Sequence, residues 1–334
     1  MADGVTRMND AREFIQVQLI PLERFAEPVF DLSLLPFEIP PGIKVADVSA
    51  MMPPSDFEYM EAEVGKHTMR FFNSPLKFGL VHRYTLPASS DDVVVKERAG
   101  LLNNVFALLR IIRPHRRQGG AGGTITDEKP RFNSLLFPHD SLDVPEAVKL
   151  FGIRSGDLVK LRNLLPIFLK AMNGPYWPIR MAVQYYYMGY EQNDWRGRYL
   201  CWGSSALHAL YSHQGRKIIP RVSKFLGENS LIYDPVDHPE YEFLPPNPLT
   251  IKDVLADVNE VRNDIAHGDR IPDRFFTAGG GRQTLGGSSI YLAVLEDAQS
   301  FIIRESLLKI LGEGLIEKFR DRGLRAQYWK ALCV

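Results

Sequence analysis

The sequence predicts an α+β N-terminal domain, residues 1–144, followed by an all-α helical bundle, residues 145–334. Three observations support this fold class. The chain has 334 residues, which is more than one hydrophobic core usually covers. Up to about residue 86 the chain has short β-prone runs separated by prolines, whereas from about residue 145 its apolar residues recur at helical spacing.

In the N-terminal part, residues 14–20 alternate between apolar and polar side chains with a period of two, as a half-buried strand does. Residues 78–86 predict a second strand, and residues 93–112 predict a helix that stops before Pro114. The glycine-rich run at residues 119–123 is typical of a flexible surface loop or linker. The strands and the helix together indicate a mixed α+β domain, without fixing its topology.

In the C-terminal part, apolar stripes at three-and-four spacing predict a series of helices. The stripes cover residues 158–172, 179–190, 195–210 and 218–226, and the last closes at Gly227. Pro178 suits a first helical position, and residues 229–248 form a proline-rich loop. Thr250, with Asp253 three positions later, predicts the capped start of a helix that runs to His267. A long helix follows at about residues 289–311, which completes a helical bundle.

Composition restricts the classes of function. Lysine and arginine together number 40, as do aspartate and glutamate, so the formal net charge is zero and a polyanion site has to be local. The two cysteines lie far apart in the sequence and suggest no disulfide framework. The sequence contains neither an apolar run of about 20 residues nor a signal peptide. We therefore expect a cytoplasmic protein that has no membrane association.

The helix predicted from Thr250 to His267 carries a charged residue within its apolar face. Its apolar side chains share one face; they are Ile251, Val254, Leu255, Val258, Val261 and Ile265. At about 100° per residue, Arg262 points into the middle of that stripe. Burying a guanidinium is costly unless it has a partner, so we expect a buried carboxylate, a second subunit or a substrate phosphate to meet it. Glu191 and Asp194 are candidate carboxylates.

His267 lies roughly 140° around an ideal helix from Arg262, so the two side chains converge only if the last turn loosens. Gly268 makes such an ending plausible. Asn263 lies four residues before His267, and its amide is placed to orient the imidazole. Local capping and pairing is the alternative interpretation, because a histidine at a helix C-terminus also interacts favourably with the helix dipole.

The run Arg262-Asn-Asp-Ile-Ala-His267 resembles the signature of the HEPN superfamily, an arginine followed after a short interval by a histidine at a helix end. The surrounding residues 261–268 are similar to the version found in ApeA-like HEPN domains, and the resemblance covers residues 145–334. It implies an all-α HEPN-like helical bundle. It also implies metal-independent cleavage of RNA at the interface of a homodimer, with no cofactor.

In that reading, Arg262 holds the scissile phosphate, His267 transfers a proton to or from the ribose, and Asn263 orients His267. ApeA-like HEPN proteins are associated with toxin and antiviral defence systems, so the resemblance implies an effector with a sensor or regulatory N-terminal domain, where a regulatory protein or ligand would bind. A non-catalytic HEPN module for RNA binding or dimerisation and a structural interaction protein are the alternatives.

Weaker patterns have mainly structural interpretations. Arg110, Arg113, Arg116 and Arg117 could follow an RNA backbone, but basic residues also suit a helix C-terminus. The aromatic residues from Tyr185 to Trp202 are spaced as core residues, although such side chains can also stack on bases. Residues 281–288 lack the lysine of a phosphate-binding loop. No histidine and cysteine spacing indicates a metal site.

Overall fold

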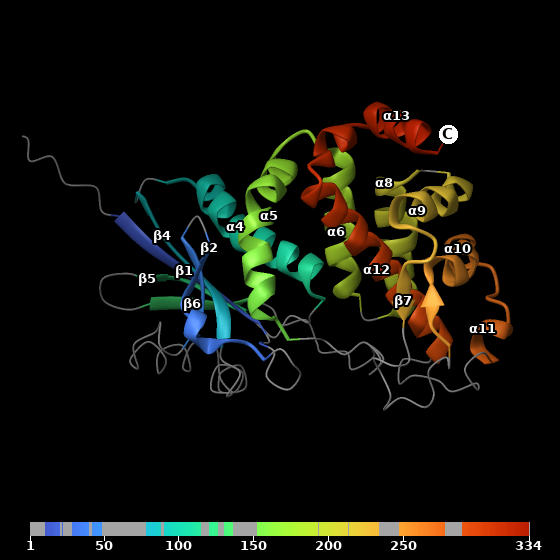
Figure 1. The fold of residues 1–334 in the computed structure, drawn as a ribbon. Coiled ribbons are helices and arrows are strands. Elements are labelled where there is room, and N and C mark those ends of the chain that lie inside the picture. Colours follow the sequence, from blue (N-terminus) through green and yellow to red (C-terminus); the bar gives the residue numbers. More distant parts are fainter. Residues whose placement is uncertain are drawn as a thin grey trace, which may run out of the picture. The chain divides into compact units, whose positions relative to one another are not determined.

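The N-terminal strands form a six-stranded antiparallel sheet in the order β2-β3-β4-β1-β5-β6 (Figure 1). The strands are β1 (Ala11–Leu19), β2 (Phe37–Ile39), β3 (Ile43–Asp47), β4 (Phe78–Pro87), β5 (Gly120–Ile125) and β6 (Pro130–Leu135). β1 and β4 pair along their whole lengths, from Ala11 opposite Pro87 to Leu19 opposite Gly79. The two strands that the sequence predicts therefore lie at the centre of the sheet.

This computed structural model describes residues 11–20, 22, 29–39, 42–48, 78–87, 90–114, 120–125, 130–135, 152–192, 194–212, 214–233, 247–277 and 289–333. The chain divides into two compact units, and each is treated by itself below. The first contains the sheet, helix α4 (Asp92–Ile112) and the part of helix α5 (Ser155–Asn173) up to Leu165; the second contains the rest of α5 and all later elements. The predicted boundary between residues 144 and 145 falls outside the described residues.

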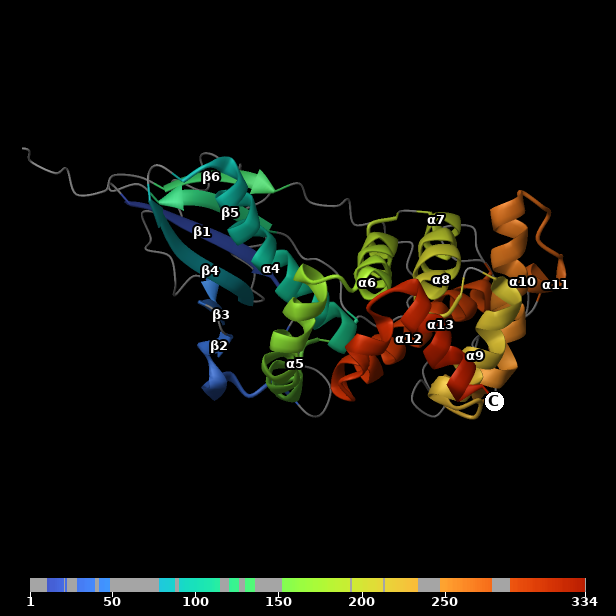
Figure 2. The same cartoon turned by 90° about the horizontal axis from the view of Figure 1, so that it is seen from above.

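The alternation predicted for β1 is confirmed in part: Ile15, Val17 and Leu19 are each 1% exposed and Gln16 is partly buried, but Gln18 is buried as well. Helix α4 packs against β1 and β4, as Figure 2 shows from above. Leu102 and every residue from Val105 to Ile112 are buried, so the C-terminal part of α4 is enclosed on all sides. The sheet and α4 thus bury a common core, which is the usual requirement for a small α+β unit.

The prediction of a loop at residues 119–123 is wrong over most of its length. Gly120 to Gly123 belong to β5 and pair with β1, with Gly120 opposite Gln18 and Gly123 opposite Ile15. Strand pairing uses backbone groups alone. A run of glycines can therefore complete a sheet even though glycine has a low β propensity and gives no side-chain pattern.

The second unit is mostly helical, and its longest helix, α12 (Ile290–Gly312), packs against α6, α7, α9, α10 and α11 (Figure 1). Its further elements are α6 (Trp177–Tyr190), α7 (Trp195–Tyr199), η2 (Leu200–Ala206), α8 (Leu207–Leu210), η3 (Gly215–Lys217), α9 (Ile218–Leu226), α10 (Ile251–His267), α11 (Arg274–Thr277), η5 (Leu315–Phe319) and α13 (Arg322–Leu332). Several predicted boundaries are confirmed, among them the Ser289 N-cap of α12 and the end of α9 at Gly227.

Two details of this unit differ from the prediction. The helix expected over residues 195–210 is interrupted by the π-helical segment η2, which lies between α7 and α8. The loop expected at residues 229–248 contributes strand β7 (Leu231–Tyr233), which pairs with β8 (Leu249–Thr250). The unit is therefore mostly helical with one two-stranded sheet, and the wide turn of η2 proves relevant to the site described next.

Candidate functional site

Helix α10, which carries the candidate site, forms where the sequence predicts it. Thr250 and Asp253 make a reciprocal capping box, in which the Thr250 amide donates to Asp253 Oδ2 at 2.7 Å. Gly268 ends the helix in the left-handed conformation, with φ 75° and ψ 18°. The apolar face packs into a core shared with α7, α11 and α12. These caps fix where each later residue of α10 points.

Arg262 is buried on that face, with 6% of its surface exposed. Its Nη1 lies 2.8 Å from His208 Nε2, and its Nη2 donates to Asn259 Oδ1 at 2.5 Å (both partners belong to the second unit). Among the described residues no carboxylate forms an ion pair with Arg262. Desolvation by burial lowers the pKa of its guanidinium. Arg262 is thus a buried cation with neutral partners.

The two candidate carboxylates have other places in the fold. Asp194 is the N-cap of α7 and accepts a hydrogen bond from the Gly197 amide at 3.3 Å. Glu191 is the C-cap residue of α6. Among the described residues the partners of Arg262 are His208 and Asn259, so neither candidate carboxylate neutralises Arg262.

Two glycines allow the polypeptide to approach Arg262 closely. A Cβ on Gly203 would lie 2.5 Å from both Arg262 Cγ and Gln299 Oε1, so η2 contacts the stem of the arginine. A Cβ on Gly215 would lie 2.6 Å from Arg262 Nη2, so η3 covers the guanidinium. The π-helical turn and the turn before α9 therefore both fit around one side chain, and π-helical turns are frequent at functional sites.

The hydrogen bond to Arg262 fixes the proton on His208. A guanidinium is a donor only, so His208 Nε2 must accept, and the neutral ring then carries its proton on Nδ1. A protonated His208 would place two donors and two positive charges face to face. Since His208 is only partly buried, this neutral imidazole connects the buried guanidinium with the protein surface.

Arg262 and His267 do not converge within one chain. Helix α10 keeps its regular form through His267, so the separation of roughly 140° around the helix remains. His267 is exposed, whereas Arg262 is buried. Asn263 is partly buried, and no hydrogen bond between Asn263 and His267 is found within the described part of α10. The loosened last turn that would join the pair is absent from this helix.

A surface pocket of about 390 Å³ lies at the C-terminal end of α10. Its lining includes Gly268, Arg196 and Arg270. Arg270 is paired with Asp273 at 2.7 Å, and Arg196 stacks on the Trp195 ring at 4.9 Å. The pocket therefore includes Gly268, the residue after His267. The positive charge of Arg270 in its lining is compensated by Asp273 of the same lining.

The two described basic residues at the end of α4, Arg110 and Arg113, do not form a surface strip. Arg110 is 1% exposed, with its guanidinium over the Phe106 ring, and Arg113 pairs with Asp157 at 2.8 Å. Arg116 and Arg117 lie outside the described residues. Arg110 is therefore a core residue that offers no charge to a nucleic acid at the surface.

Four of the seven aromatic residues from Tyr185 to Trp202 are core residues, because Tyr186, Trp195, Tyr199 and Trp202 are each at most 5% exposed. The other three, Tyr185, Tyr187 and Tyr190, are partly buried. Residues 281–288 lie outside the described residues. Over the described part of the chain, no cluster of three metal-ligating side chains is found. No helix in that part has the length and hydropathy needed to cross a membrane.

Sequence reasoning missed His208, Asn259 and the two glycines. Asn259 lies three residues before Arg262 on one helix, a spacing that brings side chains together, so the sequence contained a usable signal. His208 is 54 residues away from Arg262 in the sequence, and only the folded bundle brings the two together.

Comparison with known proteins gives no relative: no family model, no curated protein and no solved structure matches this chain. The resemblance to HEPN domains therefore depends on the residues from Arg262 to His267 and on the helical surroundings of α10.

Proposed function

We propose that the helical unit is a HEPN-like module that binds the phosphate backbone of RNA at Arg262 and cleaves the RNA without a metal ion. One observation carries the proposal: Arg262 is 6% exposed and its partners, His208 and Asn259, are neutral. A buried guanidinium normally has an anionic partner. When the fold supplies none among the described residues, the anion is expected from a ligand, and planar guanidinium groups suit phosphate.

The proposed chemistry uses the ribose as nucleophile. His267 accepts the proton of the 2′-hydroxyl, the 2′ oxygen bonds to phosphorus, and the bond from phosphorus to the 5′ oxygen breaks as that oxygen takes up a proton from water. His267 then returns its proton to the hydroxide left by that water. The products are a 2′,3′-cyclic phosphate and a 5′-hydroxyl. Arg262 stabilises the charge on the phosphate oxygens during this step, and Asn263 orients His267. The absence of a required metal comes from the HEPN resemblance.

The proposed site is composite. His267 is exposed and turned away from Arg262 on the same helix, so in our proposal His267 acts on a phosphate held by Arg262 of a second copy of the chain. The first unit would then regulate an effector of the toxin or antiviral type. The HEPN resemblance is the support for both statements.

The test compares single variants in RNA cleavage and RNA binding. We expect the purified chain to cleave labelled single-stranded RNA in the presence of EDTA. His267→Ala abolishes cleavage and keeps RNA affinity, whereas Arg262→Gln weakens both. Arg320→Gln, which removes an exposed charge elsewhere in the unit, is the matched control and leaves both unchanged. Equal cleavage by the parent and His267→Ala would remove the catalytic proposal.

The divergence of Arg262 and His267 within one chain favours a second candidate, a non-catalytic HEPN module that binds RNA or forms dimers. That module predicts Arg262-dependent RNA binding without cleavage by any variant. A structural interaction protein predicts neither, together with a monomeric mass in solution. The same two assays and one mass measurement separate the three outcomes.

A further inference from the structure

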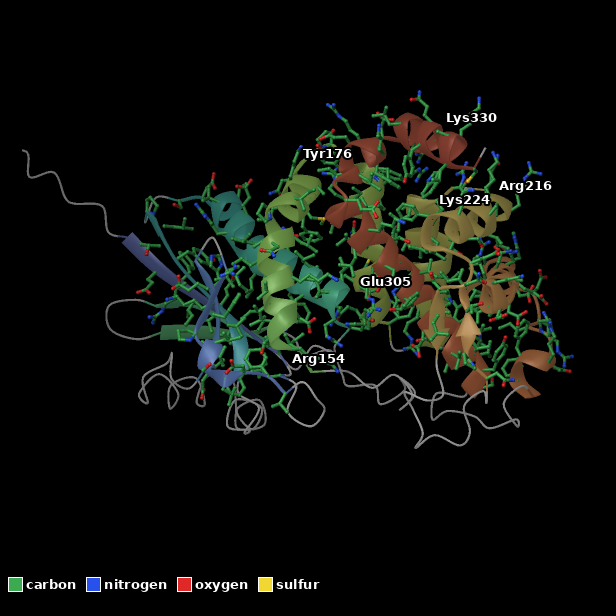
Figure 3. The ribbon with its side chains drawn as sticks, viewed as in Figure 1. Arg154, Tyr176, Arg216, Lys224, Glu305 and Lys330 are labelled. Carbon is green, nitrogen blue, oxygen red and sulfur yellow. The ribbon has the colours of Figure 1, made fainter. Side chains whose placement is uncertain are left out.

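The turn that covers Arg262 is strongly basic. From residue 214 to residue 227 the sequence contains the basic residues Arg216, Lys217, Arg221 and Lys224 and no acidic residue. Arg221 is partly buried and donates from Nη1 to the Tyr211 carbonyl. Arg216, Lys217 and Lys224 are exposed, and no ion pair of theirs is found among the described residues. Arg216 and Lys224 lie at the α9 end of the helical unit in Figure 3.

The same turn touches the buried cation. A Cβ on Gly215, the first residue of η3, would lie 2.6 Å from Arg262 Nη2 and 3.6 Å from Nη1. The backbone of the turn therefore lies against the end of the guanidinium, and the next two residues are exposed cations. Although the formal net charge of the chain is zero, three cations therefore lie at the segment Gly215–Lys217. Arg262 is buried against it, and Arg216 and Lys217 are exposed on it.

Arg262 also retains hydrogen-bonding capacity. A guanidinium has five N–H donors. Within the described structure Arg262 uses two of them, one from Nη1 toward His208 and one from Nη2 to Asn259. These two acceptors hold Nη1 and Nη2 in place without neutralising the charge. His208 and Asn259 are therefore positioning residues: they fix the guanidinium plane and leave its charge for an external anion.

We propose that the Gly215–Lys217 turn and Arg262 form one binding site for consecutive phosphates of single-stranded RNA. The buried Arg262 binds one phosphate through its remaining N–H donors. The exposed Arg216 and Lys217 bind neighbouring phosphates at the protein surface. Gly215 is required because any side chain there would displace the guanidinium. This inference rests on the proposed function, since it names the segment that recognises the RNA backbone at the same site.

RNA affinity is measured as a function of salt, with a fluorescein-labelled 2′-O-methyl RNA that cannot be cleaved. Each phosphate neutralised on a single strand contributes about 0.7 to the slope of log affinity against log salt concentration. The double variant Arg216→Gln and Lys217→Gln is expected to reduce the slope by about 1.4 and the affinity at low salt by about tenfold. The matched control, Lys318→Gln and Arg320→Gln, removes two exposed charges of η5 and the residue after it, and leaves the slope unchanged.

Gly215→Ala tests the geometry without changing any charge. The atom that must move is the far end of a flexible arginine side chain, so we expect the unfolding midpoint in urea to be maintained while RNA affinity falls about threefold, as expected when one phosphate contact rather than two is lost. His208→Gln, which keeps an acceptor for Nη1, retains affinity, and His208→Ala loses it.

The results separate this inference from the proposed function. If Arg262→Gln leaves RNA affinity unchanged, the proposed function fails. If Arg262→Gln lowers the affinity but the double variant and Gly215→Ala match the parent in affinity and in salt slope, the proposed function stands and the Gly215–Lys217 site is refuted.

Discussion

Arg198 and Arg262 are two of the three buried arginines in the described part of the helical unit (the third is Arg325), and their surroundings differ. Arg198 donates from Nε to Glu296 Oε1 at 2.5 Å and from Nη1 to the Gln192 carbonyl at 2.9 Å. The side chains of Arg198 and Glu296 are each 4% exposed. Arg262, comparably buried at 6%, has an imidazole and an amide as partners.

The difference separates a structural charge from a charge that is available to a ligand. Arg198 has a carboxyl partner within the fold, because Glu296 joins α12 to α7 and is ionised above about pH 7. The Arg262 cluster is satisfied in hydrogen bonding but not in charge. In our proposal, charge balance, rather than the presence of an arginine in a motif, is therefore the guide to which of these two residues binds a ligand.

Glu296→Ala should have the largest effect on stability. It leaves the Arg198 guanidinium buried without its carboxylate, and breaking such a pair costs about 3–5 kcal/mol of unfolding free energy. Urea denaturation measures the loss. The matched control is Glu305→Ala on the same helix (Glu305 is labelled in Figure 3). It removes the more exposed pair with Arg304 and should cost less than about 1 kcal/mol. Equal losses for the two variants would mean that the buried pair is not special.

The pH dependence of stability should reveal the same pair. Burial is the main cause that raises the pKa of Glu296 from 4.5 to about 7, and the attraction of Arg198 only partly opposes it. Between those pH values the folded state holds a proton that the unfolded chain releases, so this contribution to stability is complete below pH 4.5 and is lost as the pH rises through about 7. At about 1.4 kcal/mol per pKa unit, the change is on the order of 3 kcal/mol.

Urea denaturation of the parent and of Glu296→Gln across this pH range measures the effect. The glutamine keeps an acceptor for Arg198 but cannot titrate, so the variant should show a flatter dependence than the parent. A parent whose stability rises from pH 4.5 to pH 7 in a Glu296-dependent way would contradict the prediction.

Much of the local structure around this comparison could be predicted from the sequence. The capping box of Thr250, the apolar face of α10 and the burial of Arg262 all follow from nearest-neighbour spacing along one helix. The identity of the partner did not follow, because His208 comes from another element and contacts Arg262 only after the bundle forms. The approach of His267 to Arg262, which required a loosened last turn, is not seen, because α10 stays regular to its last residue.

The π-helical segment and β5 were missed for a related reason. Both depend on contacts between the backbone and distant parts of the chain. In η2, Gly203 contacts Arg262 and Gln299. In β5, the glycines pair with β1. Side-chain patterns within one segment contain no information on such contacts, so helical spacing over residues 195–210 predicted an uninterrupted α-helix.

Gly203→Ala should have the smallest of the three effects on unfolding free energy. It tests whether η2 positions the side chain of Arg262. The new methyl group would lie 2.5 Å from Arg262 Cγ and from Gln299 Oε1, two groups held within the core, so we expect a loss of about 1–3 kcal/mol from overpacking. The displaced arginine stem should also lower RNA affinity.

The matched control is Gly312→Ala, at a helical glycine of α12 with open space around its Cβ position. It should change the free energy of unfolding in urea by no more than about 1 kcal/mol and should leave RNA affinity unchanged. If Gly203→Ala destabilises the unit but binds RNA as the parent does, η2 supports the fold alone and Arg262 is not positioned by it.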